Sequence, residues 1–193
     1  RSVEKQVRSG HRSSFPRLHE ILTSSELEAR DVASVVCVCQ SWRNVLPRHA
    51  ASRFLPGRLE VGDNDVRERV VEVLRALGGH AKQCAGDIAS LLRHENNDVR
   101  YYALRALGAL GEHAKEHVMV IVARLGDDNS RVRCAALNAL GALGEHAKEH
   151  VGDIASLLRH ENQLRAQFGD DDVNVRYYAL RALGALGEHA KEH

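Results

Sequence analysis

The chain has 193 residues, enough for one compact domain or a short array of helical repeats. Lysine and arginine number 27 and aspartate and glutamate 26, so the near-neutral chain gives no electrostatic reason to expect binding to nucleic acid or an anionic membrane. Aromatic residues make up only 4%, so the core must consist mainly of Ala, Leu, Val and Ile, which suit thin layers of packed helices.

The 4 cysteines are Cys37, Cys39, Cys84 and Cys134, and none belongs to a C-x-x-C pair. A disulfide or zinc framework is therefore not expected. No apolar run approaches the roughly 18 residues of a membrane span. These features indicate a reducing compartment, and we expect the protein in the cytoplasm or the nucleus.

Residues 1–14 are rich in Arg and Ser and contain one acidic residue, Glu4. The composition is similar to that of an organellar transit peptide, but we interpret the segment as a disordered leader. Because the chain begins without Met, we expect it to be a fragment of a longer protein.

Residues 15–55 differ from the rest of the chain and contain its only tryptophan. Leu27 is followed by Asp31-Val32, and then by the run Val38-Cys39-Gln40-Ser41-Trp42. A D-[LV] pair at this distance before V-C-x-x-W resembles the second half of an F-box. Phe15-Pro16 corresponds to the opening Leu-Pro of that family, whereas the first helix of the family aligns only with a shift.

An F-box is a three-helix module that docks on a Skp-type adaptor of cullin–RING ubiquitin ligases. The resemblance implies that the buried seam or docking surface consists of Pro16, Leu27, Val32, Val38, Cys39 and Trp42. The alternative is that the apolar residues of this segment only cap the first repeat. Both roles are compatible, since an F-box often packs directly on the solenoid behind it.

Internal repetition is the strongest signal in the remaining sequence. Val-Arg pairs recur at spacings of 33, 33 and 43 residues, as Val66-Arg67, Val99-Arg100, Val132-Arg133 and Val175-Arg176. Residues 100–117 return unchanged as residues 176–193, and residues 86–96 return as residues 152–162. Identity of this kind indicates recent duplication of one unit.

Two amphipathic helices are predicted in each unit. In residues 98–130 a first apolar stripe consists of Val99, Ala103, Ala106, Leu107 and Leu110. After a break at Gly111, a second stripe follows, consisting of Val118, Ile121, Val122 and Leu125. Residues 126–130 supply the turn and the N-cap of the next helix. Because neither helix can bury its stripe alone, the units must stack side by side.

The unit resembles the HEAT repeat, in particular the kind named after phycobilisome lyases. The resemblance is carried by Asn97-Asp98-Val99-Arg100, Ala103-Leu104 and Leu107-Gly108, and it extends over about residues 62–193. It implies an all-α fold, a right-handed α-solenoid of HEAT-type helix pairs preceded by the small three-helix F-box-like module. We expect units at about residues 63–97, 98–130, 131–172 and 173–193.

Two departures from a regular array are visible. The third spacing carries ten extra residues, around Gln163 to Asp172, which either lengthen a helix or form a loop. The last unit stops at His193 after its first helix, so we expect an apolar face without a partner there and a truncated sequence.

Histidine patterns raise the question of metal chemistry. The i,i+4 pairs lack a separate third ligand, so a solvated turn is expected at His113/His117, His146/His150 and His189/His193. His94-Glu95 and His160-Glu161 resemble the His-Glu dipeptides of deoxyhypusine hydroxylase, an iron enzyme with a HEAT fold. Each dipeptide is expected at the end of a second helix, before a polar turn, and only two units contain one. We therefore predict no catalytic residue, no metal and no cofactor.

Arg67, Arg100, Arg133 and Arg176 share one repeat position and are expected to stack as a ladder. A ladder of arginines suits phosphate or acidic-peptide binding. We favour a structural role, in which each arginine pairs with an Asp or Asn such as Asp65, Asp98 or Asp128. One tyrosine of each of the pairs Tyr101-Tyr102 and Tyr177-Tyr178 is expected in the core.

The sequence thus predicts a non-enzymatic protein–protein interaction scaffold. The second helices are expected to line a concave face, on which the residues pointing away from the core would contact a partner: Lys82, Asp87, Lys115, Val120, Lys148 and Asp153. The leading hypothesis is a substrate receptor of a cullin–RING (SCF-type) ubiquitin ligase, with the F-box on the adaptor and the repeats on the substrate. The alternatives are a plain HEAT scaffold and, third, a HEAT-fold metal-dependent hydroxylase or bilin lyase-like enzyme. We expect protein partners, neither nucleic acid nor membrane, and a monomer outside the complex.

Overall fold

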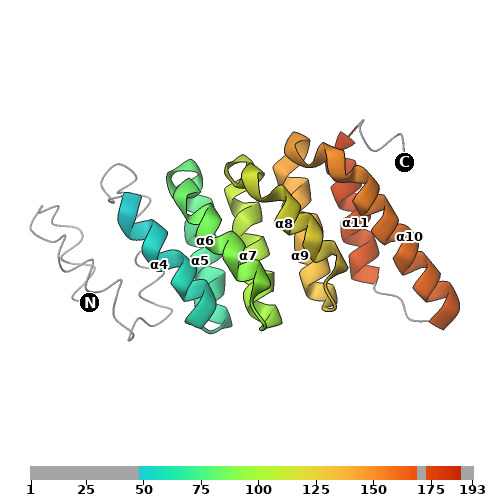
Figure 1. The fold of residues 1–193 in the computed structure, drawn as a ribbon, viewed down its shortest axis with the longest axis horizontal. Coiled ribbons are helices and arrows are strands. Elements are labelled where there is room, and N and C mark those ends of the chain that lie inside the picture. Colours follow the sequence, from blue (N-terminus) through green and yellow to red (C-terminus); the bar gives the residue numbers. More distant parts are fainter. Residues whose placement is uncertain (1–47, 169–172, 188–193) are drawn as a thin grey trace, which may run out of the picture.

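The computed structural model describes residues 48–168 and 173–187. Every regular element in these two segments is an α-helix or a 3-10 helix. The helices advance in chain order from α4 (Arg48–Val61) to α11 (Val173–Ala185), as a row two layers deep (Figure 1). The predicted all-α solenoid is confirmed. The leader and residues 15–47 of the F-box-like module lie outside the described residues.

The first layer contains the long helix of each unit: α5 (Asn64–Leu77), α7 (Asn97–Leu110), α9 (Ser130–Leu143) and α11. The residue before each of the first three helices caps it. The Asp63 side chain accepts a hydrogen bond from the Val66 amide at 2.9 Å, and those of Asn96 and Asn129 bind amides of the following first turn in the same way. The capping residues predicted in the turn at 126–130 therefore begin α9 as expected.

Each of these capped helices ends at a glycine with a positive φ: Gly78 at 50°, Gly111 at 54° and Gly144 at 54°. Residues with a Cβ rarely adopt this conformation, so glycine ends the helix and turns the chain toward the second layer. The break predicted at Gly111 is confirmed.

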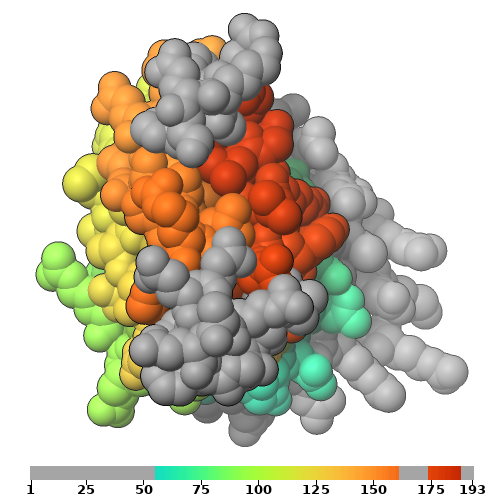
Figure 2. Space-filling model, turned by 90° about the vertical axis from the view of Figure 1, so that its right-hand side faces the viewer, coloured from blue at the N-terminus to red at the C-terminus, as the bar shows by residue number. Residues whose placement is uncertain are grey.

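The second layer is built from short α-helices flanked by 3-10 turns. It runs through η2 (Gly78–Cys84), α6 (Ala85–Ser90) and η3 (Leu91–Arg93), and then through η4 (Gly111–His117), α8 (Val118–Val122) and η5 (Ala123–Gly126). In the third unit η6 (Gly144–His150) leads into α10 (Val151–Phe168), which has 18 residues. The insertion predicted around Gln163 thus lengthens a helix as far as Phe168. Figure 2 looks onto this end of the row, where α10 and α11 lie side by side.

The predicted stripes form the core. In the first stripe Val99, Ala103, Ala106, Leu107 and Leu110 are all buried. In the second stripe Val118, Ile121 and Leu125 are buried, whereas Val122 is half-buried against the core. Burial of one leucine contributes on the order of 2 kcal/mol. The stacked stripes, rather than helix propensity, therefore hold the units together.

Neighbouring helices of the first layer approach closely because small residues meet between them. A Cβ added to Gly108 would lie 3.3 Å from the Cα of Ala139, and one added to Gly141 would lie 3.7 Å from the Cα of Ala182. Backbone therefore packs almost against backbone between α7 and α9, with no flexible side chain to move aside.

Gly108→Ala and Gly184→Ala form a matched pair, because the two glycines occupy the same position in identical sequence. Nothing lies within 4 Å of the Cβ position of Gly184, so its replacement should stabilise the protein by about 0.5–1 kcal/mol through helix propensity. At Gly108 the new methyl group presses on α9, and we expect a stability at least about 1 kcal/mol lower than that of Gly184→Ala. Urea denaturation measures both. Equal free energies of unfolding would contradict the close approach.

Candidate protein-interaction surface

Arg100 forms a buried ion pair within its own unit and hydrogen bonds to the preceding unit. Its Nε and Nη2 donate hydrogen bonds to the two carboxylate oxygens of Asp127, at 2.9 and 2.8 Å. Its Nη1 donates to the carbonyls of His94 and Glu95, at 3.0 and 2.8 Å. Burial acts to raise the pKa of Asp127, but the hydrogen bonds from Arg100 and from the Asn129 amide outweigh it, so this pKa lies below its ordinary value of 3.8.

The neighbouring arginines of the ladder also bind backbone carbonyls. Arg67 donates to the carbonyls of Leu59 and Glu60, and Arg133 donates to those of Asp127 and Asp128. The structural role predicted for the ladder is therefore observed for Arg67, Arg100 and Arg133. The predicted pairing with an Asp or Asn is observed for Arg67, which also donates to Asn64 Oδ1 at 3.0 Å, and for Arg100, which binds Asp127. Of the acceptors named, Asp128 lies 3.8 Å from Arg100, whereas Asp65 and Asp98 were wrong.

The histidines do not assemble a metal site in the part of the chain that the structure describes, where no group of three or more His, Cys, Asp and Glu side chains is suited to a metal. His94 follows η3 at the end of the second-layer segment, as predicted. His160 lies inside α10, so its predicted place before a turn was wrong, because this helix continues to Phe168.

The residues predicted to contact partners have different outcomes. The adaptor-docking set, Pro16, Leu27, Val32, Val38, Cys39 and Trp42, lies outside the described residues. On the second layer Lys82, Asp87, Lys115, Lys148 and Asp153 are exposed, and their contact with a partner stays a prediction. Val120 was expected to point into solvent, but it is half-buried and packs against the core. The exposed apolar side chain of α8 is its neighbour Met119, at 67%.

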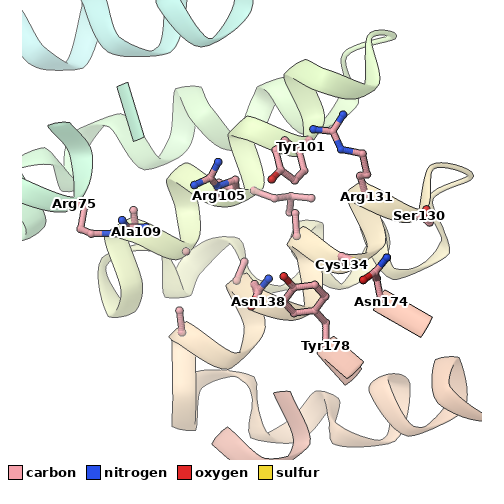
Figure 3. A pocket seen from close by; sticks show the side chains of 15 residues that line it. Arg75, Tyr101, Arg105, Ala109, Ser130, Arg131, Cys134, Asn138, Asn174 and Tyr178 are labelled. Atoms are coloured by element: carbon pink, nitrogen blue, oxygen red, sulfur yellow. The ribbon is translucent and has the colours of Figure 1, made fainter. Parts of the chain in front are cut away.

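A groove on the first layer was not predicted. It has a volume of about 550 Å³ and is formed mainly by α7, α9 and α11 (Figure 3). Its larger side chains are Arg75, Tyr101, Leu104, Arg105, Arg131, Asn138, Asn174 and Tyr178. Between them lie small residues: Gly108, Ala109, Ser130, Cys134, Ala135, Ala139 and Ala142. Every charged side chain that lines the groove is an arginine, as far as the structure describes the chain.

Two of these arginines lie against the ring of Tyr101. The guanidinium carbon of Arg131 lies 4.6 Å from the centre of the Tyr101 ring, and that of Arg105 lies 5.7 Å from it. Tyr102 packs edge-on against Tyr101, with the ring centres 4.9 Å apart. In this pair Tyr102 is the expected core tyrosine, whereas in the second pair Tyr177 is 58% exposed and Tyr178 is only half-buried.

Carboxylates outside the groove lining fix the same two arginines. Both terminal nitrogens of Arg105 donate to the carboxylate of Glu68 on α5. Arg131 donates to Asp98 at 3.2 Å. Burial acts to lower the pKa of Arg105, but the hydrogen bond to Glu68 and the nearby Tyr101 outweigh it, so that pKa is raised. The guanidinium groups are thus positioned before any partner arrives.

A comparison of two units of the chain points to the groove as a functional surface. Residues 97–118 and 130–151 are identical except at five positions, which in the second stretch are Ser130, Arg131, Cys134, Ala135 and Asn138. All five residues line the groove. The rest of the two units, residues 119–129 and 152–162, differs at eight positions of the second layer. A comparison of the first-layer helices alone would have found the five groove positions in the sequence.

Comparison with known proteins agrees with the fold. Residues 86–163 match the family of HEAT repeats, and residues 175–193 match the PBS lyase HEAT-like repeat. The chain is a HEAT-repeat protein. The resemblance of its units to HEAT repeats is thereby confirmed, whereas the F-box-like segment stays a prediction. No curated protein matches this HEAT-repeat chain.

Solved structures similar to this HEAT-repeat protein include three engineered proteins of the Northeast Structural Genomics Consortium. One is 18% identical, with 98% of both chains covered and a TM-score of 0.50. A second is 20% identical over 88% of this chain and 46% of the other, with a TM-score of 0.53. A third is 20% identical over 89% of this chain and 97% of the other, with a TM-score of 0.50. At these identities the likeness shows the fold alone. Within the described residues, no helix combines the length and apolarity needed to cross a membrane.

Asp127→Asn tests the buried pair with Arg100. We expect a loss of about 2–3 kcal/mol at neutral pH, because a buried ionic hydrogen-bonded contact between α7 and the turn before α9 is lost. The pKa of Asp127 is lower in the folded state than its ordinary value of 3.8. The stability that the ionised carboxylate contributes is therefore complete when the pH is above 3.8, and it disappears as the pH falls through the lowered pKa of the folded state. The difference between wild type and variant should therefore shrink below about pH 4.

Thermal denaturation between pH 3 and pH 7 measures this difference. Asp128→Asn is the matched control, because the Asp128 side chain is fully exposed at 3.8 Å from Arg100, and it should leave stability unchanged. An equal effect of both substitutions would contradict the assignment of Asp127 as the buried partner of Arg100.

Proposed function

We propose that this chain is a protein-interaction scaffold that binds a protein partner in the groove over α7, α9 and α11. The observation that carries the proposal is that the five residues by which 130–151 differs from 97–118 all line the groove. Exposed residues of η4 and η6 in the same two stretches, such as Lys115 and Lys148, are equally free to vary, yet residues 111–118 and 144–151 are identical. The rest of the second layer does differ, at eight positions between residues 119–129 and 152–162. Within residues 97–118 and 130–151, selection for recognition in the groove accounts for where the differences fall.

The chemistry of the lining supports binding rather than catalysis. In the described part of the chain, the lining contains no Asp, Glu, His or Lys side chain that would act as a general acid or base. Its ionisable groups are arginines, tyrosines and the buried Cys134. HEAT-type repeat folds are typical of non-enzymatic scaffolds, which agrees with this composition.

Asn138→Trp tests the groove. Asn138 is exposed on α9, so an indole at this position should cover the small residues of the groove without disturbing the core. Glu116→Trp, at an exposed position of η4, is the matched control. Quantitative affinity purification of the full chain should recover a set of proteins that Asn138→Trp reduces on the order of tenfold or more and that Glu116→Trp leaves unchanged. If the control variant loses the same proteins and the groove variant retains them, the second layer with Lys115 and Lys148 is the binding surface.

We propose further that the scaffold is a substrate receptor of a cullin–RING ubiquitin ligase. The support is the resemblance of residues 15–55 to an F-box, above all the run from Val38 to Trp42. A plain HEAT scaffold without a ubiquitin role is the alternative. In the receptor hypothesis the two tasks are separate, with the adaptor on the N-terminal segment and the substrate in the groove.

Adaptor binding separates these two hypotheses. The full chain should capture a purified Skp-type adaptor, and Trp42→Ala and Val38→Asp should each abolish capture. Asn138→Trp should leave capture intact, because it lies on the repeats. A folded chain that fails to bind the adaptor would refute the receptor hypothesis and leave the groove scaffold standing.

A further inference from the structure

We infer that the partner enters the groove as an extended acidic peptide that carries one large aromatic side chain. The inference rests on the proposed function and names the class of partner for the same surface. Three features of the groove support it: the sign of its charges, the spacing of those charges over successive helices, and the small residues between them.

The first feature is charge. Among the residues that the structure describes, Arg75, Arg105 and Arg131 line the groove, and no acidic side chain does. Arg75 is exposed and forms no hydrogen bond or ion pair with any other described residue, so its guanidinium group is free to bind a carboxylate. Arg131 uses one terminal nitrogen for Asp98, and its side chain is 60% exposed, which leaves further N–H groups for a ligand. Arginine binds carboxylates through paired N–H groups, so an acidic ligand fits this lining.

The second feature is the arrangement of the three arginines on α5, α7 and α9. Packed helices lie roughly 8–10 Å apart. An extended chain advances about 3.3 Å per residue. Carboxylates about six residues apart would therefore reach Arg75 on α5 and Arg131 on α9. Figure 3 shows the row from Arg75 through Arg105 to Arg131 that such a peptide would cross. Arg105, in the middle of the row, already binds Glu68 through both terminal nitrogens.

The third feature is the space between the arginines and the opposite wall. Ala135, Ala139 and Ala142 of α9 leave it empty of large side chains, while Tyr101 and Tyr178 border it. Carboxylates of the ligand would lie at the arginines and would not fill this space. An aromatic ring would cover the methyl groups and contact the tyrosines edge-on or stacked. A ligand that contacts the arginines and also fills the space between the walls is therefore acidic and carries an aromatic ring.

A nucleic acid is the other polyanion to consider. Glu68 and Asp98, which bind Arg105 and Arg131, offset part of the positive charge near the groove. A phosphate backbone carries one charge on every nucleotide and would approach these carboxylates. A peptide can place its acids at the arginines and neutral residues elsewhere, so the observed pattern favours a peptide.

Selection from random sequences tests the inference while the natural partner is still unidentified. The full chain serves as bait for a phage-displayed library of random dodecapeptides, and enriched peptides are synthesised for fluorescence anisotropy. We expect enriched peptides with net negative charge and at least one aromatic residue. Their affinity should fall steeply when NaCl rises from about 0.05 to about 0.5 M, because charges near solvent are screened.

Matched charge reversals locate the binding. Arg75→Glu with Arg131→Glu, both at exposed positions, should weaken binding of these peptides by about tenfold or more. Lys115→Glu with Lys148→Glu makes the same change in net charge on the second layer and should change affinity less than about twofold. Circular dichroism confirms that both double variants fold.

The outcomes separate this inference from the proposed function. Enriched peptides that are neutral or basic, yet are blocked by Asn138→Trp, would overturn the acidic ligand and keep the groove. Peptides that neither Asn138→Trp nor the arginine reversals affect would overturn both. An oligouridylate that binds more tightly than the peptides, or a library without enrichment, would also overturn the inference.

Discussion

The close approach of neighbouring first-layer helices is the constraint on which the rest of the structure depends. Gly108 lies against Ala139, and Gly141 lies against Ala182, so α7, α9 and α11 pack with little more than backbone between them. The stripes beneath are then brought together as one continuous core. The same small residues leave a groove above, because Gly108 and Ala139 also line it. Fold and candidate site are thus two consequences of one pattern of small side chains.

The arginine ladder is the second set of contacts that holds the stacked units together. The guanidinium groups of the ladder are mostly turned away from the surface. Arg67 binds carbonyls at the end of α4, and Arg100 and Arg133 bind carbonyls at the ends of second-layer segments, where helical partners are lacking. At Arg100 the carboxylate of Asp127 adds a contact to the closing turn of the same unit. These guanidinium groups are engaged in the turns. The arginines that line the groove differ from them in position, since they lie on the first-layer helices α5, α7 and α9.

Helical periodicity made the fold predictable, since every residue of the first stripe from Val99 to Leu110 is buried. The glycine break and the capping turn also followed from local chemistry. The pairing of Arg100 with Asp127 could not be predicted from local chemistry, because several aspartates lie in the same turns and only the packed geometry brings one of them to Arg100. Val120 was misplaced for a related reason, since α8 lies between 3-10 turns and its periodicity differs from that of a long helix. The groove was missed because the repeats were compared for what they share rather than for where they differ.

Near-identical units need not present a uniform surface. The sequence of residues 100–117 recurs unchanged in residues 176–193, yet the two copies contribute different side chains to the groove. The first copy lines it with Tyr101 and Arg105, whereas the second lines it with Tyr178. The reason is that α7 and α11 lie on opposite sides of α9 and turn opposite flanks toward it. With arginines gathered on one wall and a tyrosine on the other, the groove has a direction, and a bound peptide would have one preferred orientation. Duplication of a single unit thus produces a directional site once the middle helix, α9, has diverged.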